Sequence, residues 1–214
     1  MTVVAIDGPA GSGKSTIAAA LARRLGVVHV DTGAYYRAAA LVVLRGGIST
    51  SDEAAVLAAV AGATITCRDA RTLVDGVDVE DEIRGAAVTR IVSSVAAQPA
   101  VRRHLVGLQR TAVDESGAVV EGRDAGTVVV PDADLKVWLT ASPQERARRR
   151  ATQVGNADER AVSAHEVDIQ RRDSLDAQQM ARADDAIEID TTGRPVADIV
   201  DDVVSRLAAT APPA

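Results

Sequence analysis

The segment GPAGSGKS, residues 8–15, constrains the fold more than any other part of the chain. It fits the pattern G-x-x-x-x-G-K-[ST] of a loop that wraps the phosphates of a nucleotide. The β-branched run TVVAID, residues 2–7, predicts a buried strand before it, and residues 14–26 predict a helix that stops at Gly26. A strand, this loop and a helix in that order predict a P-loop nucleotide-binding domain.

Each part of the loop has a chemical task. Its glycines let successive backbone N–H groups point at a phosphate, and the start of the helix adds positive partial charge. Lys14 is expected to neutralise the β- and γ-phosphates as a catalytic residue, and the Ser15 hydroxyl is suited to Mg²⁺. The chain has only two lysines, Lys14 and Lys136, so the position of one in this loop is informative. The residues expected to bind ATP are Gly8, Pro9, Ala10, Gly11, Ser12, Gly13, Lys14, Ser15 and Thr16.

The remaining pattern predicts an α/β fold with a doubly wound parallel sheet. Further strands are expected at 27–31, 118–121, 134–141 and 186–190, and further helices at 33–47, 51–62, 86–96, 99–114, 142–153, 162–175 and 195–208. Ser51 is the expected N-cap of the helix at 51–62. Short strands with the hairpin signal Asp75-Gly76 predict a small antiparallel insert. We expect one domain, residues 1–214, with a core at about 1–62 and 86–214, an acceptor-binding insert at about 63–85 and an arginine-rich lid at about 148–172.

Charge and composition exclude several classes of protein. The net charge of −6 argues against a general nucleic-acid binder. The single cysteine, Cys67, makes no internal disulfide, and no signal peptide or 20-residue apolar span is visible, so we expect a cytoplasmic protein that does not bind membranes. A GTPase needs Asn-Lys-x-Asp to read guanine, but Asn156 is followed by Ala157. Among P-loop proteins, the class that remains is the small kinases that phosphorylate a small acceptor molecule.

Two further segments are candidates for an acceptor site. In VDTGAYYR, residues 30–37, Thr32, Tyr36 and Arg37 can share one pocket wall, because they are about one helical turn apart. In VVEGRDAG, residues 119–126, glycines flank Arg123 and Asp124 beyond a predicted parallel strand. Ligands of such sheets bind beyond the carboxyl ends of the strands.

Two arginine-rich helices are candidates for a lid. Arg146, Arg149 and Arg150 follow at i, i+3 and i+4, and Arg172 and Asp176 lie one turn apart. A solvated charged face would give the same pattern. However, phosphoryl transfer needs guanidinium groups on the transferring phosphate, and Arg149 is therefore a candidate catalytic residue.

The chain as a whole resembles the bacterial cytidylate kinases, a branch of the nucleoside monophosphate kinases. The matching stretches are IDGPAGSGKST, VDTGAYYRAAAL, DGVDVEDEIR, VSSVAAQPAVRRHLVGLQR, EGRDAGTVVVPDADLKVWLTAS, QERARRR, QRRDSLD and ADDAIEIDTT. They run in family order over nearly the whole chain. The resemblance implies a monomer with ATP-dependent, Mg²⁺-dependent phosphorylation of CMP and dCMP in pyrimidine metabolism.

The resemblance also implies a role for each acceptor residue. Arg37 and Arg123 would bind the acceptor phosphate, Arg123 as a catalytic residue. Thr32 and Tyr36 would line the acceptor site. Ser93, Arg102 and Asp124 would face cytosine, and Arg172 and Asp176 would hold the ribose. An Asp facing the N4 amino group of cytosine accepts a hydrogen bond, whereas the O4 of uracil would oppose it.

One segment departs from the family pattern. Gln179 stands where the family usually has an arginine, the segment 177–182 is shorter, and Arg182 is a possible substitute ligand. Two other functions stay open: a P-loop kinase of another monophosphate, such as UMP or AMP, and a non-catalytic regulator that binds ATP.

Overall fold

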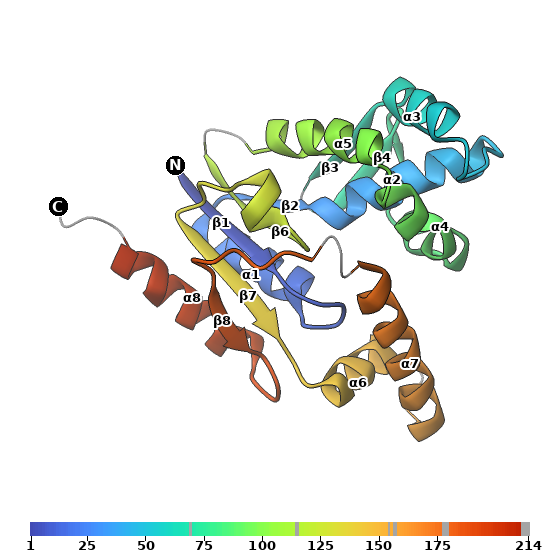
Figure 1. Cartoon of the computed structure of the whole chain (residues 1–214). Coiled ribbons are helices and arrows are strands. Elements are labelled where there is room, and N and C mark those ends of the chain that lie inside the picture. Colours follow the sequence, from blue (N-terminus) through green and yellow to red (C-terminus); the bar gives the residue numbers. More distant parts are fainter. Residues whose placement is uncertain (69, 114–115, 154, 156–157, 177–179, 211–214) are drawn as a thin grey trace.

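The computed structural model covers the whole chain and describes residues 1–68, 70–113, 116–153, 155, 158–176 and 180–210. Its centre is a five-stranded sheet (Figure 1). The strands are β1 (Thr2–Asp7), β2 (Val28–Asp31), β6 (Gly117–Gly122), β7 (Leu135–Thr140) and β8 (Ile187–Asp190). Their order is β2-β6-β1-β7-β8 and every pairing is parallel, which confirms the predicted sheet.

Helices cover both faces of this sheet, and two further helices stand at one end of it. In chain order the helices of the described residues are α1 (Lys14–Leu25), α2 (Thr32–Arg45), α3 (Glu53–Gly62), α4 (Ala86–Ala96), α5 (Pro99–Thr111), α6 (Pro143–Gln153), α7 (Glu159–Asp176) and α8 (Val196–Thr210). Side chains alternate along β1, so Val4 and Ile6 pack with α1 and α8, whereas Ala5 faces α2. The core is built mainly from aliphatic side chains, because the chain has no phenylalanine, and Tyr35 and Tyr36 are its aromatic members.

The acceptor-side insert is a separate antiparallel sheet. It consists of β3 (Ile65–Arg68), β4 (Arg71–Val74) and β5 (Val77–Asp78), in that order. Asp75 and Gly76 both have positive φ, 51° and 80°, as a two-residue hairpin turn requires. The hairpin prediction is therefore confirmed. A short 3-10 turn, Glu82–Arg84, then leads into α4.

The structure corrects three local predictions. Asp52, and not Ser51, caps α3, because its carboxylate accepts the Ala55 N–H at 3.0 Å. The helix expected at 162–175 begins earlier, at Glu159. The segment directly after Asp124 forms a π-helix, Ala125–Val129, which the sequence does not predict.

The arginine-rich helices α6 and α7 stand at one end of the sheet, away from the helices on its faces (Figure 1). They pack on each other and on the phosphate loop, where Ala10 contacts Ala147 and Ile169 in a small apolar cluster. No helix in the described residues is long and apolar enough to cross a membrane.

Candidate functional site: two pockets around the phosphate loop

The phosphate loop has the geometry that its glycines predicted. Gly8, Gly11 and Gly13 have φ values of 148°, 77° and 94°. A side chain at position 8 would also collide with β7, because its Cβ would lie 2.2 Å from the Leu139 carbonyl oxygen. The loop therefore depends on glycine both for its turn and for its close approach to the sheet.

Lys14 lies beneath this loop, with only 9% of its surface exposed. Its Nζ donates to the Pro9 carbonyl oxygen at 2.8 Å. Burial, together with the nearby Arg123 guanidinium, lowers the pKa of Lys14 to about 7. A bound polyphosphate would favour the charged form of this lysine again, because an opposite charge stabilises it.

Helix α6 supplies two arginines to the backbone of the loop. Arg146, which is buried, donates to the Ala10 carbonyl oxygen at 3.1 Å and pairs with Asp173 of α7. Arg149 donates to the Ser12 carbonyl oxygen at 3.3 Å and to the backbone oxygen of Thr191 at 2.6 Å. The sequence predicted that both arginines lie on a lid helix, but it did not predict the groups to which they donate.

A buried carboxylate stands beside the predicted metal-binding hydroxyl. Ser15 Oγ donates to Glu121 Oε2 at 2.9 Å, and Glu121 Oε1 lies 2.9 Å from His29 Nε2. The described residues contain no cluster of three or more His, Cys, Asp or Glu side chains that would hold a metal ion alone. One hydroxyl and one nearby carboxylate fit Mg²⁺ that arrives on nucleotide phosphates, because Mg²⁺ usually keeps its waters and takes few protein ligands.

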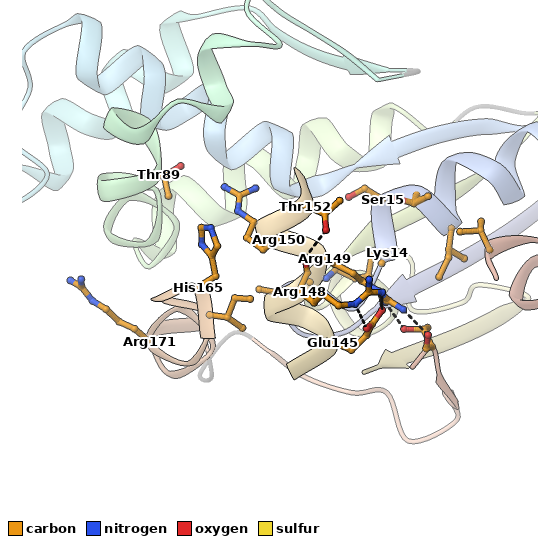
Figure 2. Close-up of a pocket in the computed structure, with 18 of the residues that line it drawn as sticks. Lys14, Ser15, Thr89, Glu145, Arg148, Arg149, Arg150, Thr152, His165 and Arg171 are labelled. Carbon is orange, nitrogen blue, oxygen red and sulfur yellow. Dashed lines mark hydrogen bonds and ion pairs between the residues drawn. The ribbon is translucent and has the colours of Figure 1, made fainter. Parts of the chain in front are cut away.

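The larger of two pockets, about 1490 Å³, extends from the phosphate loop across α6 and α7. Figure 2 shows Arg149 beside Lys14, and Arg150 reaching from α6 toward the side where Thr89 of α4 lies. Arg148 and Glu145 also line it, joined by an ion pair at 2.9 Å. This pocket has the size and the cationic lining for a nucleoside triphosphate.

The smaller pocket has a volume of about 240 Å³. It is lined by every predicted acceptor residue whose side chain the structure describes. These are Thr32, Tyr36, Arg37, Ser93, Arg102, Arg123 and Asp124. They come from α2, α4, α5 and the segment after β6, so the fold brings together residues that are up to 92 positions apart. The two pockets meet, because Ala10, Gly11, Lys14, Ser15 and Ser93 line both.

An ion pair stands at the end of the smaller pocket. Arg102 pairs with Asp124, and its guanidinium carbon lies 5.3 Å from the centre of the Tyr36 ring. Burial raises the pKa of the Asp124 carboxyl, while Arg102 opposes that shift. A carboxylate, a guanidinium and an aromatic ring together can bind a flat polar base.

Backbone contacts hold the other acceptor residues. Arg37 donates to the Ile83 carbonyl oxygen at 3.0 Å and to Thr89 Oγ1 at 3.1 Å, so it links α2 to the end of the insert. Thr32 Oγ1 donates to the Glu121 carbonyl oxygen at 2.7 Å. Arg123 donates to the Gly8 carbonyl oxygen at 2.9 Å, which ties the acceptor segment to the phosphate loop.

Sequence reasoning missed several charged residues that line the smaller pocket or contact the segments around the two pockets. They are Asp7, Asp31, Arg84, Glu121 and Asp173. Asp31 and Arg84 lie 3.5 Å apart on the wall of the smaller pocket, and burial raises the pKa of Asp31. Asp7 and Glu121 each end a strand beside a recognised motif, which was the one available signal.

The C-terminal side of the acceptor site is only partly described. Arg172 and Asp176 belong to α7, but their side chains lie outside the described residues, as does Gln179. Arg182 does not replace the missing arginine here. It pairs with Glu188 and donates to the Ala186 carbonyl oxygen at 3.1 Å, and it lines neither of the two pockets.

The chain is similar over most of its length to known proteins of one family. A family model described as Cytidylate kinase matches residues 4–209. The "Cytidylate kinase" of Pelotomaculum thermopropionicum is 45% identical, over 96% of this chain and 96% of its own. That of Rhodococcus opacus is 47% identical over 96% and 92%. Among solved structures, a gluconokinase from Sinorhizobium meliloti has the same fold, with a TM-score of 0.53 at 15% identity over 97% of this chain and 92% of its own.

Proposed function

The chain belongs to the cytidylate kinase family, and we propose that it transfers the γ-phosphoryl group of ATP to CMP and dCMP, giving CDP and dCDP. One observation carries the proposal beyond family membership. The large cationic pocket and the small acceptor pocket share Lys14 and Ser15. A donor phosphate and an acceptor phosphate bound in them would meet at the phosphate loop.

At the donor end, the loop binds the triphosphate through its backbone N–H groups, Lys14 and the Ser15 hydroxyl. The Ser15 hydroxyl, with the Glu121 carboxylate beside it, would hold Mg²⁺, which would supply charge neutralisation for the phosphates. The hydrogen bond from Arg149 to the Ser12 carbonyl oxygen supports a role for this guanidinium beside the transferring phosphoryl group. The whole segment 8–16 forms this binding site.

At the acceptor end, Asp124 selects the base. Its carboxylate accepts from the N4 amino group of cytosine, while Arg102 and Ser93 serve the N3 and O2 acceptors. Uracil presents O4 to the same carboxylate, and two opposed acceptors are costly in a buried site. The Tyr36 ring and the Thr32 side chain complete the pocket around the base.

The reaction needs positioning more than acid–base chemistry. The attacking phosphate oxygen of CMP is already ionised near neutral pH, so no strong general base is required. Arg37 and Arg123 hold the acceptor phosphate in line with the γ-phosphorus, and Lys14 and Arg149 neutralise the charge that develops. From the family pattern, Arg172 and Asp176 hold the ribose.

The domain assignment belongs to the same proposal. Two contacts support an acceptor-binding insert at about 63–85: Arg84 lines the smaller pocket, and the Ile83 carbonyl oxygen accepts a hydrogen bond from Arg37. The lid at about 148–172 moves over bound ATP. A monomeric, cytoplasmic enzyme that does not act on nucleic acid is the expected form.

A coupled assay with ATP, Mg²⁺ and a panel of CMP, dCMP, UMP and AMP tests this function. We expect the largest kcat/KM for CMP or dCMP. A clear preference for UMP or AMP would show that the enzyme is a kinase of that monophosphate and not of CMP. Tight ATP binding with no turnover on any acceptor would favour the non-catalytic regulator, for which the altered segment around Gln179 is the one argument.

A further inference from the structure

Asp7 is a buried carboxylate that the proposed mechanism does not use. It is the last residue of β1, immediately before the phosphate loop, and only 4% of its surface is exposed. Its Oδ1 accepts the backbone N–H of Ala125 at 2.8 Å, and its Oδ2 accepts that of Gly126 at 2.8 Å. One side chain on the donor side thus holds two consecutive amides of the acceptor segment.

The segment it holds has an irregular backbone. Asp124, at φ −146° and ψ 25°, lies between β6 and the π-helix, and Ala125 begins that π-helix. A side chain at Gly126 would come within 3.3 Å of Asp7 Oδ2, so glycine permits the close approach. The two hydrogen bonds to Asp7 therefore fix the backbone directly after Asp124.

A second contact ties the same segment to the phosphate loop. Arg123 donates to the carbonyl oxygen of Gly8, the residue next to Asp7. The donor loop and the segment 123–126 are thus joined on both sides of Asp124. A shift of this backbone would move the two side chains that face the acceptor.

We propose that Asp7 is a positioning residue that sets the orientation of Arg123 and Asp124, and through Asp124 the choice of cytosine over uracil. The inference rests on the proposed function. Asp7 acts through the backbone of the acceptor segment and touches neither nucleotide in this account.

The chemistry requires an ionised carboxylate. Both oxygens then accept hydrogen bonds, whereas an amide or a protonated acid turns one acceptor into a donor facing an N–H. Burial raises the pKa of Asp7 to about 6, with the Ala125 and Gly126 N–H groups and Lys14 opposing the shift and Asp124 adding to it. A buried charge of this kind is a poor stabiliser of a fold, which argues against a purely structural role.

The test compares Asp7→Asn with Asp134→Asn. Asp134 is the matched control, because its Oδ2 also accepts a backbone N–H on β1, that of Val3 at 2.7 Å, at the opposite end of the strand. For Asp7→Asn we expect kcat/KM with CMP to fall roughly tenfold or more, because a hydrogen bond to a charged group is lost. The KM for ATP should change far less, and the ratio of kcat/KM for CMP to that for UMP should fall. Asp134→Asn should leave all three values unchanged.

An unchanged CMP-to-UMP ratio in folded Asp7→Asn would overturn the role of Asp7 and leave the proposed function intact. A wild-type protein that does not phosphorylate CMP would contradict the proposed function itself, so the two failures are distinguishable. If Asp7→Asn does not fold, NMR of the wild-type protein decides. The amide protons of Ala125 and Gly126 should follow the pH titration of the Asp7 carboxyl carbon, and a titration that leaves both amides unmoved contradicts the inference.

Discussion

The Asp173 carboxylate on α7 accepts the backbone N–H of Ala10 in the phosphate loop at 3.2 Å. The same residue pairs with Arg146, which donates to the Ala10 carbonyl oxygen, so one residue of the loop is held at both its backbone N–H and its backbone C=O. Because Ala10 lines both pockets, this contact connects the α6–α7 pair to the point where the two substrates meet.

Asp173→Ala is expected to lower kcat/KM for both ATP and CMP. The substitution leaves the buried Arg146 without its carboxylate, and losing one member of such a pair costs about 3–5 kcal/mol when it is fully buried. This pair is partly exposed, with 10% and 19% of the two side chains accessible, so a smaller effect of roughly tenfold is expected. Steady-state kinetics with each substrate varied in turn measures it.

Ser174→Ala is the control for that variant, because Ser174 is the neighbouring exposed residue and its hydroxyl donates only within α7, to the Gln170 carbonyl oxygen at 2.9 Å. It should behave as the wild type. If Asp173→Ala and Ser174→Ala have equal kcat/KM values for ATP and CMP, the contact between Asp173 and Ala10 does not contribute to activity.

Lys14→Met is expected to abolish turnover and to make the folded protein more stable at pH 6. Burial lowers the pKa of Lys14 to about 7, well below that of an exposed lysine in the unfolded chain. Between the two values the unfolded chain binds more protons, so this group's contribution to stability rises as the pH rises from 7 toward 10. Below pH 7 the cost of burying the ammonium is largest, on the order of 5 kcal/mol at about 1.4 kcal/mol per pKa unit.

Thermal unfolding at pH 6 and pH 9 measures this difference. The gain in Tm of Lys14→Met over the wild type should be larger at pH 6 than at pH 9. A lower Tm at pH 6 would contradict the unfavourable burial of this charge, and near-normal turnover would contradict the assignment of the phosphate loop.

Asp124→Asn is expected to weaken the preference for cytosine. The amide can donate to the O4 of uracil, where the carboxylate could only accept. We expect kcat/KM for CMP to fall tenfold or more, since a hydrogen bond to a charged group is worth about 1.5–3 kcal/mol, and that for UMP to fall less or to rise. Asp132→Asn, at an exposed position after the same segment, is the control. A parallel loss for CMP and UMP would mean that Asp124 does not read the base.

Glu121→Gln is expected to raise the Mg²⁺ concentration needed for half-maximal activity. Its carboxylate holds the Ser15 hydroxyl at 2.9 Å, and an amide removes the negative charge beside the site where Mg²⁺ is expected. ATP binding without Mg²⁺, measured by calorimetry, should weaken little or even tighten, because a negative charge near the phosphates is gone. An unchanged Mg²⁺ requirement would limit Glu121 to a structural role with His29.

Local signals in the sequence predicted much of this molecule. The glycine pattern of residues 8–15 predicted the loop, Gly26 the end of α1, and Asp75-Gly76 the hairpin, because each depends on a few neighbouring residues. Where two neighbours could fill one role, the prediction was less secure. Ser51 and Asp52 can both cap a helix, and only the path of the chain before α3 decides for Asp52.

Contacts between segments that are distant in the chain could not be predicted from the sequence. Asp7 with Gly126, Ala10 with Asp173, and Ser15 with Glu121 join residues more than 100 positions apart. Their partners are backbone amides or a hydroxyl, which leave no charge pattern in the sequence. The π-helix after Asp124 could not be predicted for the same reason. A run of valines favours a strand, but the hydrogen bonds to Asp7 hold the backbone there in a different conformation.

The most direct test of the whole account is a competition between acceptors in one reaction. ATP labelled at the γ-phosphate is mixed with Mg²⁺, the protein and equal concentrations of CMP and UMP, and labelled CDP and UDP are separated and counted at early times. Their ratio equals the ratio of the two kcat/KM values. The account predicts an excess of labelled CDP that disappears in Asp124→Asn. Equal labelling of CDP and UDP by the wild-type protein, or label in neither product, would contradict it.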